Sequence, residues 1–292
     1  MKHESGSRES KNLGGGSGIW RPESGIRHPG GRGFSNFEFR IYKFFLRAAA
    51  DIVGAVKPEA ILYDLDDTLL VNSMDTFVPA YLGALTEFMA DHVEPRRLTD
   101  SLLAAIRTMD RNTDWTRTNA EVFFEAFLPP LGRPQMELGS LFERFYGEVF
   151  PRLRSLTRPA DGSQAAVRWA REAGHNVVVA TNPMFPQTAI EQRIRWADLA
   201  PEEFDLVTTI EGSHATKAQV EYYSEIARNL GVEPSRCVMV GDNWQWDVAH
   251  STRAGMAAWW IADPSTPPLD PSVQILGRGS LTDFVAFAER HL

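Results

Sequence analysis

Short apolar runs, each followed by polar residues, recur along the chain and predict buried strands. The runs cover residues 60–63, 176–180, 237–240 and 257–261. Runs of this length without polar interruption are typical of parallel strands that helices cover on both faces. The pattern therefore predicts an α/β fold with a doubly wound parallel sheet.

A long insertion separates the first two predicted strands, and its apolar residues recur at helical spacing. The predicted helices span residues 75–90, 98–109, 118–127 and 136–150. An insertion of this length is sufficient for a domain. We therefore expect a helical domain over residues 73–158, inserted into a core of residues 57–72 and 159–292. Beyond it, we expect one helix near 187–196 and one strand near 204–208.

The N-terminal residues differ in composition from the rest of the chain. Residues 1–33 hold nine of the 22 glycines, and this composition predicts a disordered tail over residues 1–36. Over residues 37–56, charged residues at spacings of three and four predict an amphipathic helix. We expect this helix to pack on the protein's own body or on a second copy, and docking on a membrane surface or on a partner is the alternative.

Composition and charge exclude several classes of protein. The sequence is 43% hydrophobic and 23% charged, which is typical of a soluble globular protein. A net charge of −8 argues against a broad nucleic-acid surface, so no nucleic-acid partner is expected. The single cysteine, Cys237, excludes an internal disulfide and a cysteine-based zinc site. No run is long and apolar enough to span a membrane, and we expect a cytoplasmic protein.

Candidate catalytic carboxylates follow the first predicted strand, in the sequence Asp64-Leu65-Asp66-Asp67-Thr68. In open α/β sheets, reactive groups gather at the carboxyl ends of the strands. Two carboxylates two residues apart can divide the work, Asp64 attacking and Asp66 exchanging protons. Taken alone, the cluster is equally compatible with a turn or a calcium loop.

Three later segments supply polar partners in a fixed order. Thr181 and Asn182 follow the second strand and offer a hydroxyl and an amide to a phosphate group. Lys217 stands at the start of a helical pattern, and Asp242 follows the third strand, five residues before Asp247. Each residue alone has a structural explanation, such as a cap or a surface lysine. The order of all four segments indicates a single site.

These segments resemble the four sequence motifs of the haloacid dehalogenase superfamily of phosphohydrolases. The matching residues are, in motif order, Asp64 to Thr68, Thr181, Lys217, and Asp242 with Asp247. The resemblance covers about residues 58–262 and implies a Rossmann-like core with an inserted helical cap of the C1 type, as in subfamily I. One departure is that Ala218 follows Lys217, where the family commonly has proline.

The resemblance implies a phosphatase that acts on a small phosphorylated substrate through an aspartyl-phosphate. It assigns the nucleophile to Asp64 and the general acid and base to Asp66. It places Lys217, Thr181 and Asn182 around the transferring phosphoryl oxygens.

The resemblance also implies Mg²⁺ as the cofactor. The ion would take carboxylate oxygens from Asp64 and Asp242 and the backbone carbonyl of Asp66. Asp247 would lie in this ligand shell or directly behind it.

Two alternatives to a phosphatase stay open, and a third is disfavoured. A phosphotransferase or phosphomutase would use the same aspartyl-phosphate chemistry. A binding protein with vestigial activity is suggested by the N-terminal tail and helix. A dehalogenase is disfavoured, because the family's dehalogenases generally lack the carboxylate corresponding to Asp66 and a halide leaves without a proton.

Polar residues of the insertion are candidates for contact with the substrate, and solvated helix ends are the other interpretation. The candidates are Arg107, Arg111, Asn112, Arg117 and Asn119. Trp244 and Trp246 either form an aromatic wall beside the pocket or pack against the cap or core.

Overall fold

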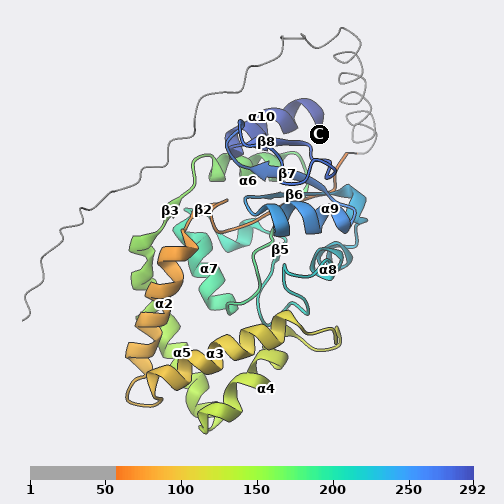
Figure 1. Ribbon diagram of the computed structural model, residues 1–292. Coiled ribbons are helices and arrows are strands. Elements are labelled where there is room, and N and C mark those ends of the chain that lie inside the picture. Colours follow the sequence, from red (N-terminus) through yellow and green to blue (C-terminus); the bar gives the residue numbers. More distant parts are fainter. Residues whose placement is uncertain (1–56) are drawn as a thin grey trace, which may run out of the picture. The chain divides into compact units, whose positions relative to one another are not determined.

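The computed structural model describes residues 57–292 of the chain (Figure 1). The tail predicted over residues 1–36 and the helix predicted over residues 37–56 lie outside the described residues. Within residues 57–292, no helix is both long and apolar enough to cross a membrane.

Six parallel strands form the central sheet, in the order β5-β4-β1-β6-β7-β8. Their bounds are Ala60–Tyr63 for β1, Asn176–Val179 for β4, Leu206–Val207 for β5, Cys237–Gly241 for β6, Ala257–Ile261 for β7 and Gly277–Gly279 for β8. The chain runs outward from β1 through β4 to β5, then returns to β6 and runs outward the other way. The order therefore reverses between β1 and β6, which is where open α/β sheets bind their ligands.

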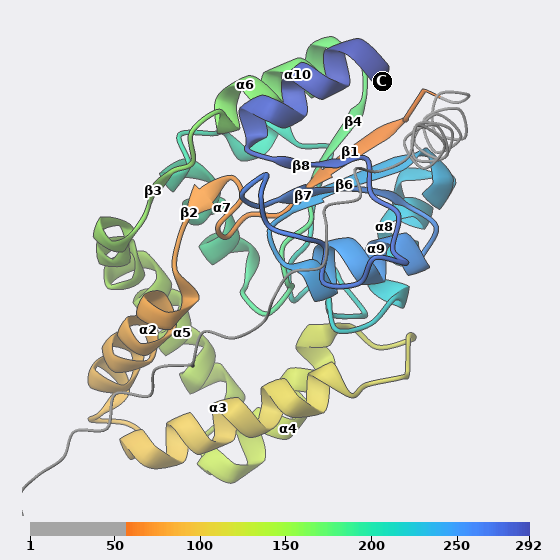
Figure 2. The same ribbon diagram turned by 45° about the horizontal axis from the view of Figure 1, so that its top comes forward.

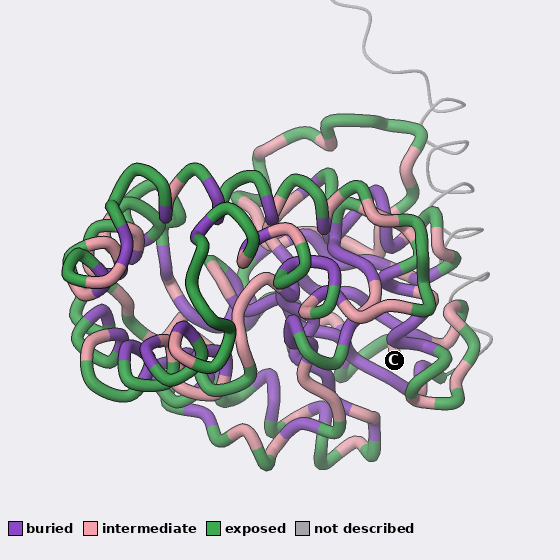
Figure 3. Tube along the Cα trace, turned by 90° about the horizontal axis from the view of Figure 1, so that it is seen from below, coloured by how far each residue is buried: buried purple, intermediate pink, exposed green. Residues whose placement is uncertain are grey.

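Helices cover both faces of this sheet (Figure 2). Ile61 and Tyr63 belong to the core on the side of α6 (Ser163–Glu172) and α10 (Leu281–His291). Leu62, between them, belongs to the core on the side of α8 (Glu221–Leu230). Because both faces are covered, all four residues of β1 are apolar and buried, without alternation. Figure 3 shows buried residues gathered in the interior of the trace and exposed residues on its outer turns. The predicted fold class is confirmed.

The helical insertion lies between β1 and β4. Its helices are α2 (Met74–Met89), α3 (Pro95–Asp110), α4 (Asn119–Leu131), α5 (Gln135–Glu148) and the 3₁₀ helix η1 (Phe150–Leu156). Two short antiparallel strands, β2 (Leu70–Val71) and β3 (Arg158–Pro159), join the insertion to the core. Its interior is rich in aromatic side chains in edge-to-face contact, such as Phe77 on Phe150.

Shorter elements complete the core. They are α7 (Gln187–Trp196), α8 (Glu221–Leu230), α9 (Ser251–Arg253), the 3₁₀ helices η2 (Pro201–Glu203) and η3 (Pro234–Arg236), and the π-helix η4 (Trp244–His250). The bounds of α7 agree with the sequence prediction, whereas α3 begins three residues earlier than predicted. The cause is the Glu94 carboxylate, which accepts hydrogen bonds from the backbone N–H groups of Arg96 and Arg97 ahead of the apolar pattern.

The thiol of Cys237 tests this packing in solution. Cys237 is buried at the first position of β6, and burial raises its pKa to about 12, with a further contribution from Glu59. We expect no reaction with a thiol reagent in the native protein at about pH 7.5, and complete reaction in denaturant. The measurement is the rate of labelling, with Cys237→Ala as the blank. Rapid labelling of the native protein would show that this end of the sheet is open.

Candidate active site

The candidate site lies at the reversal point of the sheet, because its first and last motifs follow the two central strands. Asp64 comes directly after β1, and its backbone N–H donates to the carbonyl of Val240 in β6 at 2.9 Å. Asp242 comes directly after β6. The strand pairing therefore brings together two segments that are far apart in the sequence.

Three carboxylates meet at this point. Oxygens of Asp64, Asp242 and Asp247 all lie within 4.8 Å of one another. Asp247 is fully buried and Asp64 is nearly so. The π-helix η4 sets the position of Asp247, whose Oδ2 accepts a hydrogen bond from the backbone N–H of Asn243 at 3.0 Å. Oxygen ligands in such a group suit a hard divalent cation.

The ammonium group of Lys217 joins two of these carboxylates. Its Nζ lies 2.7 Å from Oδ1 of Asp64 and 2.7 Å from Oδ1 of Asp247, and the side chain is almost completely buried. Lys217 precedes α8 by four residues, so it lies on a loop and not at the start of the helix as predicted. Oδ1 of Asp64 also accepts the backbone N–H of Leu65, which leaves Oδ2 for chemistry.

The site is electrostatically incomplete without a further cation. Burial raises the pKa of Asp64, and it raises the pKa of Asp242 to about 7, with the Asp247 carboxylate adding to both shifts. Burial alone would lower the pKa of Lys217, but the carboxylates of Asp247 and Asp64 raise it above its ordinary value. One ammonium thus faces three carboxylates, and the donor set fits a divalent metal ion.

Asn182 and His250 hold the loop that carries Lys217. The side-chain oxygen of Asn182 accepts the backbone N–H of Lys217 at 3.2 Å, and its Nδ2 contacts the sulfur of Met184 at 3.0 Å. Nδ1 of His250 lies 2.9 Å from the carbonyl of Lys217. The side chain of Asn182 therefore connects two motifs, a structural role that the sequence did not predict.

Thr181 lies beside the nucleophile candidate at the tip of β4. The backbone N–H of the preceding Ala180 donates to the carbonyl of Tyr63 at 2.7 Å, which aligns the two strand ends. The carbonyl of Thr181 accepts hydrogen bonds from the hydroxyls of Tyr222 and Thr208, each at 2.8 Å. These hydrogen bonds fix the backbone of Thr181, the residue whose side-chain hydroxyl belongs to the motif.

Asp66 is bound by two side chains that the sequence analysis did not identify. Its Oδ1 accepts a hydrogen bond from Nδ2 of Asn72 at 2.7 Å and forms an ion pair with Nη2 of Arg193 on α7. Arg193 is among the most buried side chains of the described residues. A signal was present in the sequence, because Arg193 falls on the same face of the helix as the apolar Ile190 and Ile194.

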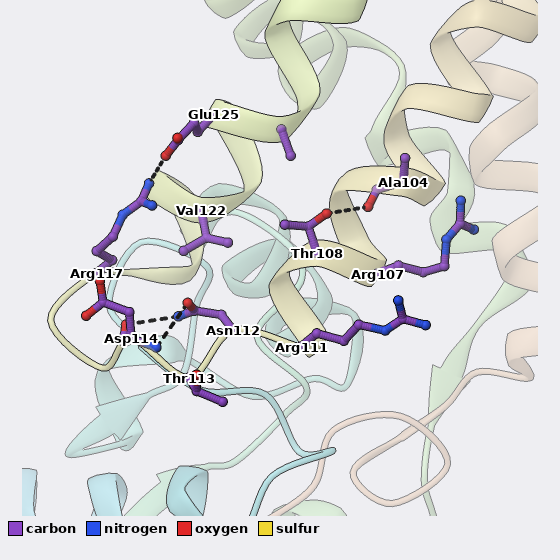
Figure 4. A pocket seen from close by; sticks show the side chains of 11 residues that line it. Ala104, Arg107, Thr108, Arg111, Asn112, Thr113, Asp114, Arg117, Val122 and Glu125 are labelled. Atoms are coloured by element: carbon purple, nitrogen blue, oxygen red, sulfur yellow. Dashed lines mark hydrogen bonds and ion pairs between the residues drawn. The ribbon is translucent and has the colours of Figure 1, made fainter.

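A cavity of about 760 Å³ lies between α3 and α4 and the loop that joins them (Figure 4). Arg107, in the last turn of α3, and Arg111, directly after the helix, extend their guanidinium groups in the same direction (Figure 4), and neither forms an ion pair among residues 57–292. Arg117 instead pairs with Glu125. These residues stay candidates for contact with the substrate.

Two of the other candidates have structural roles. Asn119 is fully buried, and its Nδ2 donates to the carbonyl of Ala215 at 3.0 Å, so it fastens the insertion to the core and does not reach a substrate. The prediction failed because nothing at the N-terminus of a helix marks a contact 96 residues away. Trp244 is buried and packs edge-to-face on Trp260 at 4.8 Å, which favours the core interpretation for this residue.

The carboxylates of this site lie at the carboxyl ends of the central strands of a doubly wound sheet, where proteins of this fold class bind their ligands. A sequence model of haloacid dehalogenase-like hydrolases matches residues 58–255, and the chain belongs to this family. The prediction of the family is therefore confirmed.

Two solved structures have a similar fold. The 2-haloacid dehalogenase from Pseudomonas syringae pv. Tomato DC3000 has a TM-score of 0.55 and 23% identity, covering 80% of this chain and 99% of its own. CbbY from Rhodobacter sphaeroides, solved in complex with phosphate, has a TM-score of 0.50 and 20% identity, covering 80% and 99%. No curated protein sequence matches this chain. At these identities the likeness shows the fold alone.

Gly241 offers a test of the position of Asp247. A Cβ at Gly241 would lie 2.6 Å from Cβ of Asp247, a contact that side chains do not tolerate. We expect Gly241→Ala to displace Asp247 and to abolish the stabilisation that added Mg²⁺ gives, measured as a shift of Tm. The matched control is Gly83→Ala in α2, where no atom lies within 4 Å. The control should keep the Mg²⁺ response and gain roughly 0.5–1 kcal/mol in helix stability. An unchanged Mg²⁺ response in Gly241→Ala would place the metal elsewhere.

The pKa of Asp242 predicts how stability depends on pH. Its pKa rises from 3.8 to about 7 on folding, so the folded state binds the proton more tightly. The contribution of Asp242 to the stability of the metal-free protein should therefore fall as pH rises from about 4 to about 7, measured against Asp242→Asn. Mg²⁺ needs the ionised carboxylate, so its stabilising effect should be small near pH 6 and larger near pH 8. Thermal unfolding with and without Mg²⁺ at each pH measures both effects. Equal Mg²⁺ stabilisation at the two pH values would contradict the prediction, and Asp242→Asn should remove the difference.

Proposed function

We propose that the protein is a Mg²⁺-dependent phosphatase that hydrolyses a small phosphomonoester through an aspartyl-phosphate on Asp64. The observation that carries this proposal is the carboxylate of Asp66, two residues after Asp64 and held by two donors. A phosphate ester needs a proton on its leaving oxygen, whereas a halide does not. A carboxylate at this position therefore favours phosphoester chemistry over dehalogenation.

The residues of the site account for both steps of the reaction. In the first step, Oδ2 of Asp64 attacks phosphorus while the bond from phosphorus to the leaving oxygen breaks and Asp66 gives its proton to that oxygen. In the second step, Asp66 takes a proton from a water that attacks the aspartyl-phosphate, and inorganic phosphate leaves. Lys217 and Thr181 stabilise the charge on the phosphoryl oxygens.

Mg²⁺ would be held by the carboxylates of Asp64 and Asp242 and by the backbone carbonyl of Asp66, and it would supply the positive charge that an anionic substrate needs in this acidic site. Asp247 orients the group, since its two oxygens bind Lys217 and the backbone of Asn243. A phosphotransferase would use the same residues and differ in the acceptor, which the cap selects by excluding water.

A substrate screen tests the reaction class. We expect hydrolysis of phosphomonoesters, among them sugar phosphates and phosphorylated acids, which needs Mg²⁺ and stops in EDTA. Release of halide from a 2-haloacid is measured in parallel. Halide release without phosphatase activity would identify a dehalogenase and refute the proposal. Transfer of labelled phosphate to a second hydroxyl would identify the phosphotransferase.

Variants of Asp64 and Asp66 test the two roles. Asp64→Asn removes the nucleophile, so turnover should fall to background. Asp66→Asn keeps the nucleophile and should give a burst with p-nitrophenyl phosphate, a good leaving group, and then stall because the base is missing. Rapid quench and mass spectrometry should detect an adduct of about 80 Da, the mass of a PO₃H group, in Asp66→Asn.

The matched control for these variants is Asp100→Asn, an exposed carboxylate on α3 that pairs with Arg96. It should keep full activity. An adduct in Asp64→Asn, or normal turnover in either site variant, would overturn the assignment of roles.

A further inference from the structure

We propose that Arg193 is a positioning residue that fixes the orientation of Asp66 for proton transfer and connects it to the cap. The proposal rests on the proposed function for the role of Asp66, whereas the contact itself can be tested without activity. No motif of the sequence contains Arg193, and its position depends on the packing of α7 between core and cap.

Within residues 57–292, both side-chain contacts of Asp66 fall on one of its two oxygens. Oδ1 accepts both the amide of Asn72 and the guanidinium of Arg193. The side chain of Asp66 is 19% exposed and that of Arg193 is 1% exposed, so solvent reaches the carboxylate but not the guanidinium that binds it. With Oδ1 occupied by two donors, Oδ2 is the oxygen left to exchange a proton with a substrate or water.

The environment of Arg193 belongs to both parts of the molecule. Its guanidinium carbon lies 5.5 Å from the ring centre of Phe77, on cap helix α2, and 5.1 Å from that of Phe185, in the core. Both rings stabilise the cation through their faces. Phe77 also packs edge-to-face on Phe150, which lies near the C-terminal end of the inserted sequence. A movement of α2 would therefore change the surroundings of the group that holds Asp66.

Stability alone does not explain a buried arginine at this position. Within residues 57–292, the one carboxylate that pairs with Arg193 is that of Asp66, and Nε of Arg193 has no hydrogen-bond partner. Buried ion pairs give little net stability compared with apolar side chains of similar volume, because both charges lose their hydration. Ile or Met at position 193 would continue the apolar face of α7. The guanidinium is explained by what it does to Asp66.

The kinetic experiment compares two leaving groups in single turnovers of Arg193→Met. An alkyl phosphate needs a proton on its leaving oxygen, whereas p-nitrophenolate needs little. We expect the first-step rate to fall about 100-fold with the alkyl phosphate and less than about 10-fold with p-nitrophenyl phosphate. Arg193→Lys keeps a cation and should restore part of the loss with the alkyl phosphate. Equal losses with the two substrates would mean general structural damage and would overturn the proposal.

A double variant shows whether Arg193 acts through Asp66. In the Asp66→Asn background there is no proton donor left to position, so adding Arg193→Met should cause no further loss with the alkyl phosphate. The matched control is Arg144→Met, which removes another arginine over a phenylalanine ring, that of Phe88 at 5.5 Å, outside the site. It should leave both first-step rates unchanged. An additional loss in the double variant as large as in the wild-type background would refute the proposal.

Unfolding of the same four proteins separates failure of this proposal from failure of the proposed function. If the pair forms in solution, the double variant should be destabilised less than the sum of the two single variants. Additive destabilisation would overturn the proposal even if the protein is a phosphatase. Conversely, coupled stabilities in a protein without phosphatase activity would refute the proposed function and the positioning role, while showing that the contact exists.

Discussion

The contact of the Lys217 ammonium with the carboxylates of Asp64 and Asp247 is the constraint on which the site depends. Each of these groups is buried, and a buried charge is tolerated only when it is paired and hydrogen-bonded. The lysine also joins the loops after β1 and β6 to the segment before α8. Loss of the Lys217 ammonium would leave two buried carboxylates near each other with backbone hydrogen bonds but without the positive charge that pairs them.

Backbone topology makes this contact possible. The strand order reverses between β1 and β6, so the ends of these two strands diverge into separate loops and leave space for side chains between them. Gly241 then lets Asp247 approach the end of β6 more closely than any side chain would allow. Burial and the neighbouring Asp247 carboxylate raise the pKa of Asp242 to about 7, because together they outweigh the opposing effect of Lys217. The fold thus prepares a place for a cation before one binds.

Most of the core and its motifs could be predicted from the sequence, because both are local in the chain. The bounds of β1 and α7 agree with the prediction. The strand β1 is buried on both faces and forms a continuous apolar run, whereas α7 is buried on one face and shows apolar residues at helical spacing. The paired strands β2 and β3 have two residues each and leave no pattern at all. The contact of Arg193 with Asp66 joins residues 127 positions apart, so only the tertiary packing shows it.

The fold alone does not define the reaction of this protein. A dehalogenase and a phosphate-binding protein share this architecture with the chain at similar coverage. A covalent carboxylate at the end of the first strand serves either chemistry, because both begin with attack by that group. In the proposed mechanism, the difference lies in whether a proton can be delivered to the leaving atom, and this step requires Asp66 in a fixed orientation. In this chain, Asn72 from the loop between β2 and α2 and Arg193 from α7 both bind Oδ1 of Asp66. The reaction that the fold supports is therefore decided by side chains that surround the motifs as much as by the motifs themselves.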